Sequence, residues 1–323
     1  MSLLDCLAND LDLDPRFIVT ISRFSHRYYR KFKIPKKSGG VRWIFQPSAA
    51  LKSLQYWLVH HVVSCLPVHE CATAYRLGCS IKNNALFHAN SKHLVRLDIR
   101  DFFPSIGFDL LAQRIAESGS NIPNGEAIKN EDLRLIKGIG FFRGRLTIGS
   151  VCAPAISNAV MYPFDCFAAE YAKSHDLIYT RYADDIVFSG PEFIPRSIVN
   201  DMSCKLKEFG FILNDHKTIF MGGSGRKVVT GVFLNTGKPS IGRVRKDFIK
   251  RLIYRHLRYQ EGNSAEILGH LNYLRDIEPE TFNRIVRKYS LMFGTNLMEV
   301  LKRAREIESF PKEAAATVHY RKV

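Results

Sequence analysis

The sequence of 323 residues lacks most of the marks of secreted, membrane-bound and zinc-binding proteins. Its seven cysteines are odd in number and form no C-x-x-C pair, which argues against a disulfide framework and against zinc, and suits a reducing compartment. No apolar stretch is long enough to span a bilayer, and the N-terminus has no basic segment followed by an apolar run. We therefore expect a cytoplasmic protein with no membrane partner.

Acidic residues are scarce relative to basic ones. The sequence has 47 Lys and Arg but only 31 Asp and Glu, which leaves a net charge of +16. An excess of this size is typical of proteins that bind a polyanion, with nucleic acid ahead of an acidic membrane surface, although a merely soluble basic protein is the plain alternative. Hydrophobic residues make up 46% of the chain and include 22 Phe and 13 Tyr, which predicts a folded core.

Repeats and low-complexity tracts are also absent, so the organisation has to be inferred from changes in periodicity. The first region, to about residue 90, contains a predicted basic hairpin, from 32–35 and 41–45, followed by an amphipathic helix. The middle region, 91–240, mixes short apolar strands with helices, which indicates an α+β fold. Beyond it, helical segments are expected at 244–259, 264–274 and 279–293.

Three aspartates lie where predicted strands end. Asp98 closes one apolar strand, and Asp184 with Asp185 lies between the apolar runs 177–182 and 186–189, at the tip of a predicted hairpin. Neighbouring carboxylates resist joint ionisation unless a cation is present, and Mg²⁺ accepts such oxygen ligands together with substrate phosphates. The alternatives are an ordinary polar turn and a helix N-cap at Asp98. Taken singly, these alternatives are favoured, although two bound Mg²⁺ ions can activate a hydroxyl and stabilise a leaving pyrophosphate.

The residues around these aspartates resemble the catalytic motifs of reverse transcriptases. Asp98 lies in Leu97-Asp-Ile-Arg-Asp-Phe-Phe-Pro-Ser-Ile, and the pair lies in Tyr182-Ala-Asp-Asp. The resemblance implies an α+β right-hand polymerase whose palm is an antiparallel sheet with helices on one face. The implied regions are an N-terminal part with fingers at 1–90, a palm at 91–240 with a fingers-like insertion at about 110–150, a helical thumb at 241–311 and a basic tail at 312–323. The implied metal ligands are Asp98, Ile99, Asp184 and Asp185.

Two further motifs concern the incoming deoxynucleoside triphosphate. Ile34-Pro-Lys-Lys-Ser-Gly-Gly-Val-Arg is similar to the fingers motif that holds the triphosphate, which indicates Lys37 and Arg42, and a solvated basic hairpin is the alternative. Phe103 stands where the family places an aromatic residue that blocks a ribose 2′-hydroxyl, and simple core packing is the alternative.

Two later motifs are expected beside the same substrate. Gly149 lies in a motif similar to the one that the family places beside nucleotide and template, but Ile148 and Ala153 replace its usual Gln and Ser, which puts a polar side-chain contact in doubt. The alternative is a loop that enters a packed helix. Lys217 follows Asn214-Asp-His, where the family has a lysine near the triphosphate, and a solvated lysine after a turn is the alternative.

Two short strings resemble motifs of bacterial retron reverse transcriptases: Asn84-Ala-Leu-Phe-His88 and Val229-Thr230-Gly231. An ordinary helix start and an ordinary strand are the alternatives. The resemblance implies that a cognate noncoding RNA serves as template and primer for multicopy single-stranded DNA, in an antiviral defence system with a separate effector protein. A group II intron-like or other defence-associated enzyme, or a non-catalytic RNA sensor with a polymerase fold, are the competing hypotheses.

The predicted helix at 244–259 carries basic residues opposite an apolar face. Contact with RNA phosphates is the functional interpretation, since a dense cluster of one sign repels itself, and a solvated helix face is the alternative. The predicted RNA-binding residues are Asn84, His88, Val229, Thr230, Gly231, Arg243, Lys246, Lys250, Arg251 and Arg255.

Overall fold

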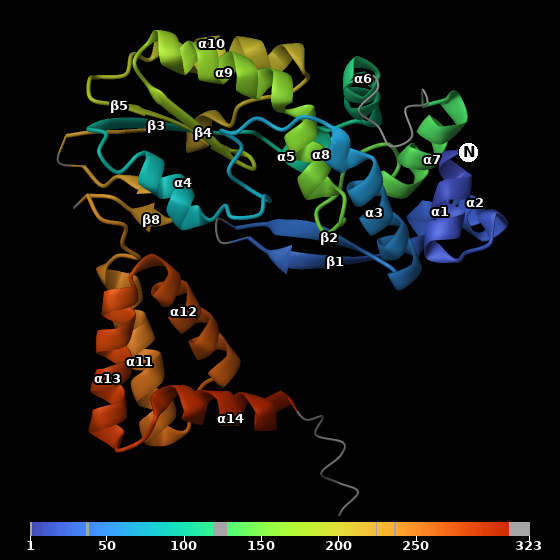
Figure 1. The fold of residues 1–323 in the computed structure, drawn as a ribbon. Coiled ribbons are helices and arrows are strands. Elements are labelled where there is room, and N and C mark those ends of the chain that lie inside the picture. Colours follow the sequence, from blue (N-terminus) through green and yellow to red (C-terminus); the bar gives the residue numbers. More distant parts are fainter. Residues whose placement is uncertain (1, 37–38, 119–127, 224, 236, 310–323) are drawn as a thin grey trace, which may run out of the picture. The chain divides into compact units, whose positions relative to one another are not determined.

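The computed structural model describes residues 2–36, 39–118, 128–223, 225–235 and 237–309 (Figure 1). These residues pack as two units. The first contains the described residues of 1–80 and 91–225, and the second contains those of 81–90 and 226–323. The predicted α+β class is confirmed, because the first unit combines sheets with helices.

A four-stranded antiparallel sheet forms the centre of the first unit, in the order β4-β5-β3-β6. Its strands are β3 (His93–Asp98), β4 (Ile178–Tyr182), β5 (Asp185–Gly190) and β6 (Ile219–Met221). Buried apolar residues fill one face of β3 and β5, with Val95 and Leu97 opposite Phe188 and Ile186, whereas the other face also carries polar and charged residues. The short runs of β-branched and aromatic residues explain why these segments are strands. Helices α9 (Tyr162–Ser174) and α10 (Ser197–Glu208) lie over one face (Figure 1).

A second, two-stranded sheet is the predicted basic hairpin. Strand β1 (Tyr29–Pro35) pairs with β2 (Val41–Pro47), and most of both strands is exposed. The amines of Lys31 and Lys33 lie 3.9 and 4.7 Å from the centre of the Trp43 ring, so cations cover the aromatic surface. The predicted amphipathic helix follows as α3 (Ala49–His61), which the Ser48 side chain caps.

The remaining helices of the first unit share one continuous apolar core with the central sheet. They are α1 (Leu3–Leu11), α2 (Pro15–Arg23), α5 (Phe102–Ser105), α6 (Phe108–Ser118), α7 (Asn130–Gly140) and α8 (Ala153–Val160). This shared core fixes the sheet edge on which the catalytic candidates lie.

The second unit is mostly helical. It contains α4 (Ile81–Phe87), the short strands β7 (Val228–Val229) and β8 (Val232–Phe233), and the helices α11 (Arg243–Tyr259), α12 (Ser264–Ile277), α13 (Pro279–Phe293) and α14 (Leu297–Ser309). The three predicted C-terminal helices are confirmed. Helix α14 was not predicted, although the Asn296 side chain accepts hydrogen bonds from the backbone of Met298 and Glu299 and so marks its start.

The three-region division of the chain stays a prediction. Residues 81–90, which the sequence placed with the N-terminal region, pack with the C-terminal residues. The predicted tail at 312–323 and part of the predicted insertion lie outside the described residues. Among the helices that the structure describes, none has the length and apolar character needed to cross a membrane.

Candidate active site

The three aspartates meet at the end of the central sheet, as predicted. Asp98 is the last residue of β3 and faces Asp185, the first residue of β5, in the antiparallel ladder. The β4–β5 hairpin closes through a two-residue loop, Ala183 and Asp184. The Asp184 carbonyl accepts a hydrogen bond from the Ile99 backbone at 3.0 Å, so the hairpin loop is tied to the segment that follows β3.

Asp98 is buried and already has a cationic partner. The Lys217 ammonium lies 2.9 Å from both carboxylate oxygens, although the lysine side chain is half exposed. Asn214 adds a backbone hydrogen bond to the Asp98 carbonyl at 2.8 Å and a side-chain contact of 3.4 Å to Oδ1. The site therefore favours a positive charge at this point, where Lys217 stands in for a cation.

The hairpin aspartates lie in an environment that disfavours their charged forms. Burial and the neighbouring Asp184 raise the pKa of Asp185 to about 6. Burial also raises the pKa of Asp184, with the Asp98 carboxylate acting in the same direction, while the positive charges of Lys217 and Arg42 oppose the shift. A divalent cation would relieve this repulsion.

The three aspartates fit a magnesium site in which substrate phosphates supply the remaining ligands. The donors are carboxylate oxygens, and Ile99 has a buried apolar side chain, so only its backbone carbonyl could be a ligand. Within the described part of the chain, no three His, Cys, Asp or Glu side chains converge into a ready-made metal centre. That arrangement suits Mg²⁺, which keeps several waters and binds one or two protein carboxylates together with substrate phosphates.

The predicted nucleotide-binding residues lie on several separate segments of the first unit where the structure describes them. Arg42 lies on β2 and is exposed, and its charge acts on Asp184. Phe103 is half-buried, with its ring 5.4 Å from that of Phe102 and 6.5 Å from that of Tyr75. Lys37 lies outside the described residues. The nucleotide-binding role of these residues stays a prediction.

Gly149 has a structural requirement that the sequence did not reveal. Its φ of 103° lies in the region that favours glycine, and an added Cβ would lie 2.8 Å from the Phe45 carbonyl oxygen. The Phe45 backbone also donates a hydrogen bond to the Ile148 carbonyl at 2.8 Å. Ile148 thus contributes its backbone to the contact with β2, independently of the side chain that departs from the family pattern.

Tyr75 is a site residue that sequence reasoning missed. It is half exposed, and its ring centre lies 6.5 Å from those of both Phe103 and Tyr182. Its φ of 61° is unusual for a residue with a large side chain. No local pattern marks it, because its place beside Phe103 depends on contacts between distant segments.

The two retron-like strings meet in the second unit. The Thr230 hydroxyl donates a hydrogen bond to the Ile81 carbonyl at 3.1 Å, which joins the segment between β7 and β8 to α4. Asn84, His88 and Val229 are fully buried, and burial lowers the pKa of His88 to about 3. The strings therefore build one packed junction, and these three side chains are not presented to a ligand at its surface.

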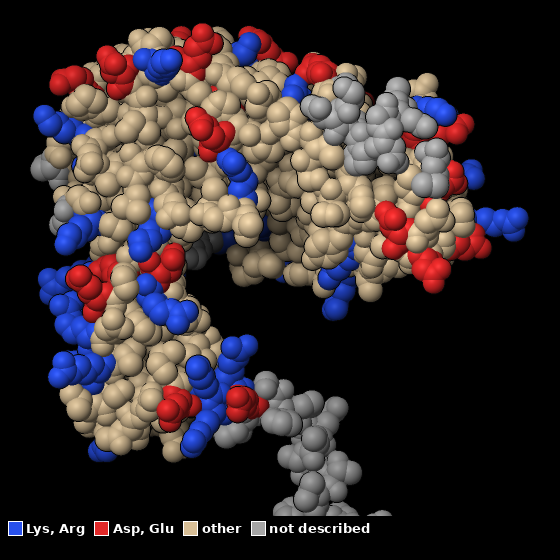
Figure 2. Space-filling model, viewed as in Figure 1, with Lys and Arg blue, Asp and Glu red and all other residues tan. Residues whose placement is uncertain are grey.

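The basic helix α11 is less uniformly charged than its sequence suggests. Asp247 pairs with Arg243 at 3.7 Å and with Lys250 at 2.9 Å, and Arg255 pairs with Glu261. Lys246 is mostly buried and contacts Glu278 at 2.6 Å. Figure 2 shows Lys and Arg gathered on the helical part of this unit.

A groove on the second unit combines cations with aromatic rings. Arg251 is exposed on α11 and lies in no ion pair as close as 4.0 Å among the described residues, although its charge helps to lower the pKa of Asp247. The residues that line the groove are Lys250, Arg251, Tyr254, Arg255, Tyr259, Glu261 and Tyr289. Such a surface offers both phosphate contacts and stacking faces, the two elements of single-stranded nucleic-acid binding.

A sheet that carries paired aspartates beside a basic hairpin is the arrangement of a template-directed polymerase, and comparison with known proteins gives the class. Residues 34–269 match the reverse transcriptase (RNA-dependent DNA polymerase) family, to which the chain belongs. An apo telomerase structure from Candida tropicalis shares the fold, with a TM-score of 0.50 and 9% identity over 90% of this chain and 66% of that chain.

Curated relatives narrow the class to the retron group. The chain is 34% identical to the retron Ec73 reverse transcriptase of Escherichia coli, over 80% of this chain and 86% of the relative. It is 31% identical to the retron Ec83 reverse transcriptase of the same organism, over 90% of this chain and 95% of the relative. The retron interpretation is thereby confirmed, and the protein is an RNA-directed DNA polymerase.

Proposed function

We propose that DNA synthesis takes place at Asp98, Asp184 and Asp185 by two-metal phosphoryl transfer. The observation that carries this proposal is the position of three partly or fully buried carboxylates at one end of the central sheet, where the pKa of two of them is raised. When bound, two Mg²⁺ ions would activate the primer hydroxyl and stabilise the leaving pyrophosphate.

The residues of the chain prepare this reaction by holding charge in place. Asn214 orients Asp98 through its backbone and side chain. Lys217 neutralises Asp98 in the structure, and its half-exposed ammonium would also suit a triphosphate oxygen if Asp98 held a metal ion. Arg42 approaches the same site from β2, and its planar guanidinium suits a phosphate.

The β1–β2 hairpin is assigned to the fingers, the four-stranded sheet to the palm, and helices α11 to α14 to the thumb. Phe103, with its half-buried ring, selects deoxynucleotides by excluding a 2′-hydroxyl, and Gly149 keeps the loop before α8 close to β2. The groove on α11 supplies the RNA contacts, with Arg251 as its unpaired cation among the described residues.

The substrate that follows from the retron group is a structured noncoding RNA that serves as template and primer. Its product is multicopy single-stranded DNA joined to RNA, and the system provides antiviral defence through a separate effector protein. Support comes from the retron relatives together with the net charge of +16, which suits a polyanionic partner.

The test is to purify the wild-type protein from its native cell and to sequence the nucleic acid that accompanies it. Branched DNA linked to RNA is expected with wild type and absent from Asp184→Ala,Asp185→Ala. In parallel, both proteins are assayed on a generic RNA template with a DNA primer. If the double variant extends the primer at the wild-type rate, the two aspartates are not required for catalysis. If the wild-type protein extends the primer but carries no co-purified DNA, the proposed retron substrate is wrong.

A further inference from the structure

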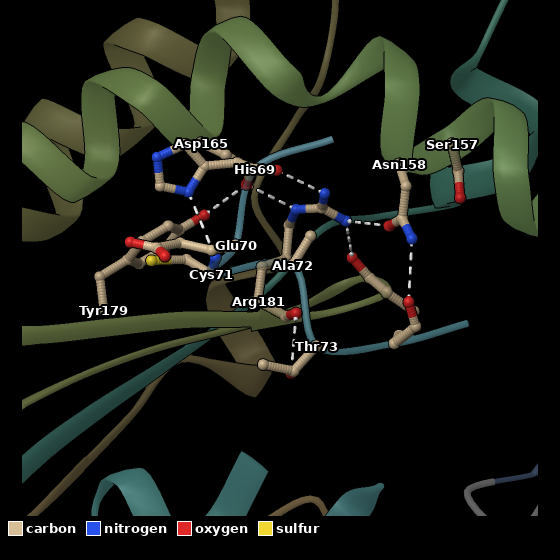
Figure 3. Close-up of polar contacts among 12 residues, drawn as sticks. His69, Glu70, Cys71, Ala72, Thr73, Ser157, Asn158, Asp165, Tyr179 and Arg181 are labelled. Atoms are coloured by element: carbon tan, nitrogen blue, oxygen red, sulfur yellow. Dashed lines mark hydrogen bonds and ion pairs between the residues drawn. The ribbon is translucent and has the colours of Figure 1, made fainter. Parts of the chain in front are cut away.

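A buried ion pair lies directly behind the catalytic hairpin. Arg181 on β4 and Asp165 on α9 are both fully inaccessible to solvent. The guanidinium donates from Nε to Oδ1 at 2.7 Å and from its second amino group to Oδ2 at 2.6 Å, and the Tyr179 hydroxyl donates to Oδ1 at 2.7 Å (Figure 3). The Asp165 carboxylate thus accepts three hydrogen bonds from two residues of one strand.

The third guanidinium nitrogen of Arg181 makes hydrogen bonds outside the ion pair. It donates to the Ala183 carbonyl at 3.2 Å, in the loop that carries Asp184. It also contacts the Asn158 side-chain oxygen at 3.3 Å, and the Asn158 amide donates to the Ala74 carbonyl at 2.9 Å. One guanidinium therefore connects the catalytic hairpin with the segment before Tyr75 (Figure 3).

The Arg181 backbone makes the same connection a second time. Its amide donates to the Cys71 carbonyl at 2.8 Å, and its carbonyl accepts from the Thr73 amide at 2.8 Å. A short parallel bridge between Ala72 and Arg181 results. The 71–74 segment is therefore fastened to the edge of the catalytic sheet.

Both segments that Arg181 holds contain strained backbone. Ala183 has a φ of 59° and Tyr75 has a φ of 61°, in the left-handed region that residues with a Cβ rarely adopt. Such conformations persist only where their surroundings over-determine them, and they cluster at functional sites. The carbonyl of Ala183 itself accepts a hydrogen bond from Arg181. The carbonyl of Ala74, the residue before Tyr75, accepts one from Asn158.

We propose that Arg181 is a positioning residue for DNA synthesis, which fixes the Asp184 loop and the Tyr75 segment relative to each other, so that Tyr75 forms a wall of the nucleotide site beside Phe103. The inference rests on the proposed role of Asp184 and Asp185 in binding metal. Well-packed apolar residues would hold a core at least as well as a buried ion pair, so stability alone does not account for the pair. The ion pair also holds the Arg181 guanidinium where it can donate a hydrogen bond to the Ala183 carbonyl, which an apolar side chain could not do.

The first experiment removes both charges together, because removing one would leave the other buried and unpaired. The neutral variant is Asp165→Leu,Tyr179→Phe,Arg181→Met, and its matched control is Tyr171→Phe, which loses a hydrogen bond from the same helix to Asp201. Folding is checked by circular dichroism and thermal melting. Primer extension is then measured over a Mg²⁺ series and a deoxynucleotide series.

The neutral variant is expected to fold but to lose about tenfold to a hundredfold in kcat, as a displacement of the reacting groups would produce. The Mg²⁺ concentration for half-maximal activity should rise about tenfold, which is typical when residues behind metal ligands are lost. The control variant Tyr171→Phe should have the wild-type kcat and the wild-type Mg²⁺ dependence. A folded neutral variant with wild-type kcat and Mg²⁺ dependence would overturn the proposal.

A second variant tests the Tyr75 side and keeps the ion pair. Asn158→Ala removes the link between Arg181 and the Ala74 carbonyl, and the expected result is a raised KM for deoxynucleotides with kcat retained. Tyr75→Ala should raise the same KM without lowering the melting temperature, because the ring is half exposed. An unchanged KM in both variants would reject the role of Tyr75, whether or not the neutral variant folds.

Asp184→Asn separates this inference from the proposed function. If that variant extends primers as wild type does, the metal-site assignment fails and the positioning role fails with it. If it is inactive while the neutral variant behaves as wild type, only the positioning role fails.

Discussion

At the scale of single residues, the paired aspartates of the hairpin work against the stability of the metal-free protein. Their carboxylates are sheltered from water and close to each other, and the pKa of Asp185 is raised from its ordinary value of 3.8 to about 6. A raised folded-state pKa means that the folded protein binds a proton more tightly than the unfolded chain. Stability is therefore lost as the pH rises through this range.

Asp185→Asn should consequently stabilise the metal-free protein at pH 8, by roughly 1–3 kcal/mol from the size of the shift, while it abolishes DNA synthesis. Urea unfolding in the presence of a chelator measures the effect at pH 8 and at about pH 3, where the unfolded carboxyl is also largely protonated. The gain should disappear at the lower pH. A variant that is less stable than wild type at pH 8 would contradict this account.

Phe103→Ala should admit ribonucleotides. With the half-buried ring removed, the ratio of kcat/KM for ribonucleotides to that for deoxynucleotides should rise by about tenfold or more, which corresponds to about 1.4 kcal/mol. Phe209→Ala, at the end of α10, removes another half-buried ring and serves as the control. If Phe103→Ala discriminates as well as wild type, the ring is simply part of the core.

Single residues also show where sequence-based prediction ends. Asp98, Asp184 and Asp185 were predictable because strand ends and a hairpin tip are local features that the apolar runs define. The contact between Lys217 and Asp98 was not, since it joins residues 119 positions apart. Tyr75 was missed for the same reason.

At the scale of elements, the junction of α4 with β7 and β8 depends on a neutral histidine. His88 is fully buried, and its pKa is lowered to about 3. The unfolded chain has an ordinary histidine that takes up a proton below about pH 6.5. Protons therefore favour the unfolded state, and stability falls as the pH drops below that value.

His88→Leu should flatten the fall in stability between pH 7 and pH 5, where the histidine accounts for about 2 kcal/mol. Urea unfolding at both pH values, with the exposed His26→Gln as control, measures the effect. The control should keep the wild-type pH dependence. An equal fall in His88→Leu and wild type would show that other groups control the acid sensitivity.

Helix α11 allows a comparison between paired and unpaired cations. Arg251→Glu should weaken RNA binding and reduce the salt dependence of the binding constant by a slope of about 1 to 2, because an exposed cation is replaced by an anion. Lys246→Met is the comparison, since Lys246 contacts Glu278 inside the unit and should alter stability more than the salt slope. If the salt dependence of RNA binding is the same in Arg251→Glu and wild type, α11 does not contact the RNA phosphates through this residue.

Part of the elements was predictable, whereas no helix was predicted at α1, α2 or α14, and the helices of the middle region were expected only in general terms. Alternating apolar residues and turn residues marked the hairpin and the sheet, and helical periodicity marked α3, α11, α12 and α13. The pairing of α4 with β7 and β8 was not predictable, because periodicity reports which face of an element is buried and not which partner buries it.

At the scale of the whole molecule, the two units are interleaved along the chain. The first contains the three aspartates proposed to be catalytic, and its two chain segments flank residues 81–90, which pack with residues beyond 225. The described residues of 1–225 therefore include a helix whose buried side chains, such as Asn84 and His88, have their packing partners elsewhere.

A fragment of residues 1–225 should therefore be insoluble or melt without cooperativity, although it contains the whole catalytic sheet. Co-expression of residues 226–323 should restore solubility, because it returns the partners of α4. Soluble yield, gel filtration and calorimetry decide the outcome. A monomeric fragment with a sharp melting transition would show that α4 does not need the second unit.

This interleaving also sets an order of events during translation. The hydrogen bond between Thr230 and Ile81 joins residues 149 positions apart, so α4 leaves the ribosome long before the strands that cover it. Contacts of such sequence separation form slowly and leave apolar surface open in the meantime. The basic second unit can be completed only after its C-terminal helices have been synthesised, and a nascent chain whose central sheet is already finished still lacks the part that we expect to select its RNA.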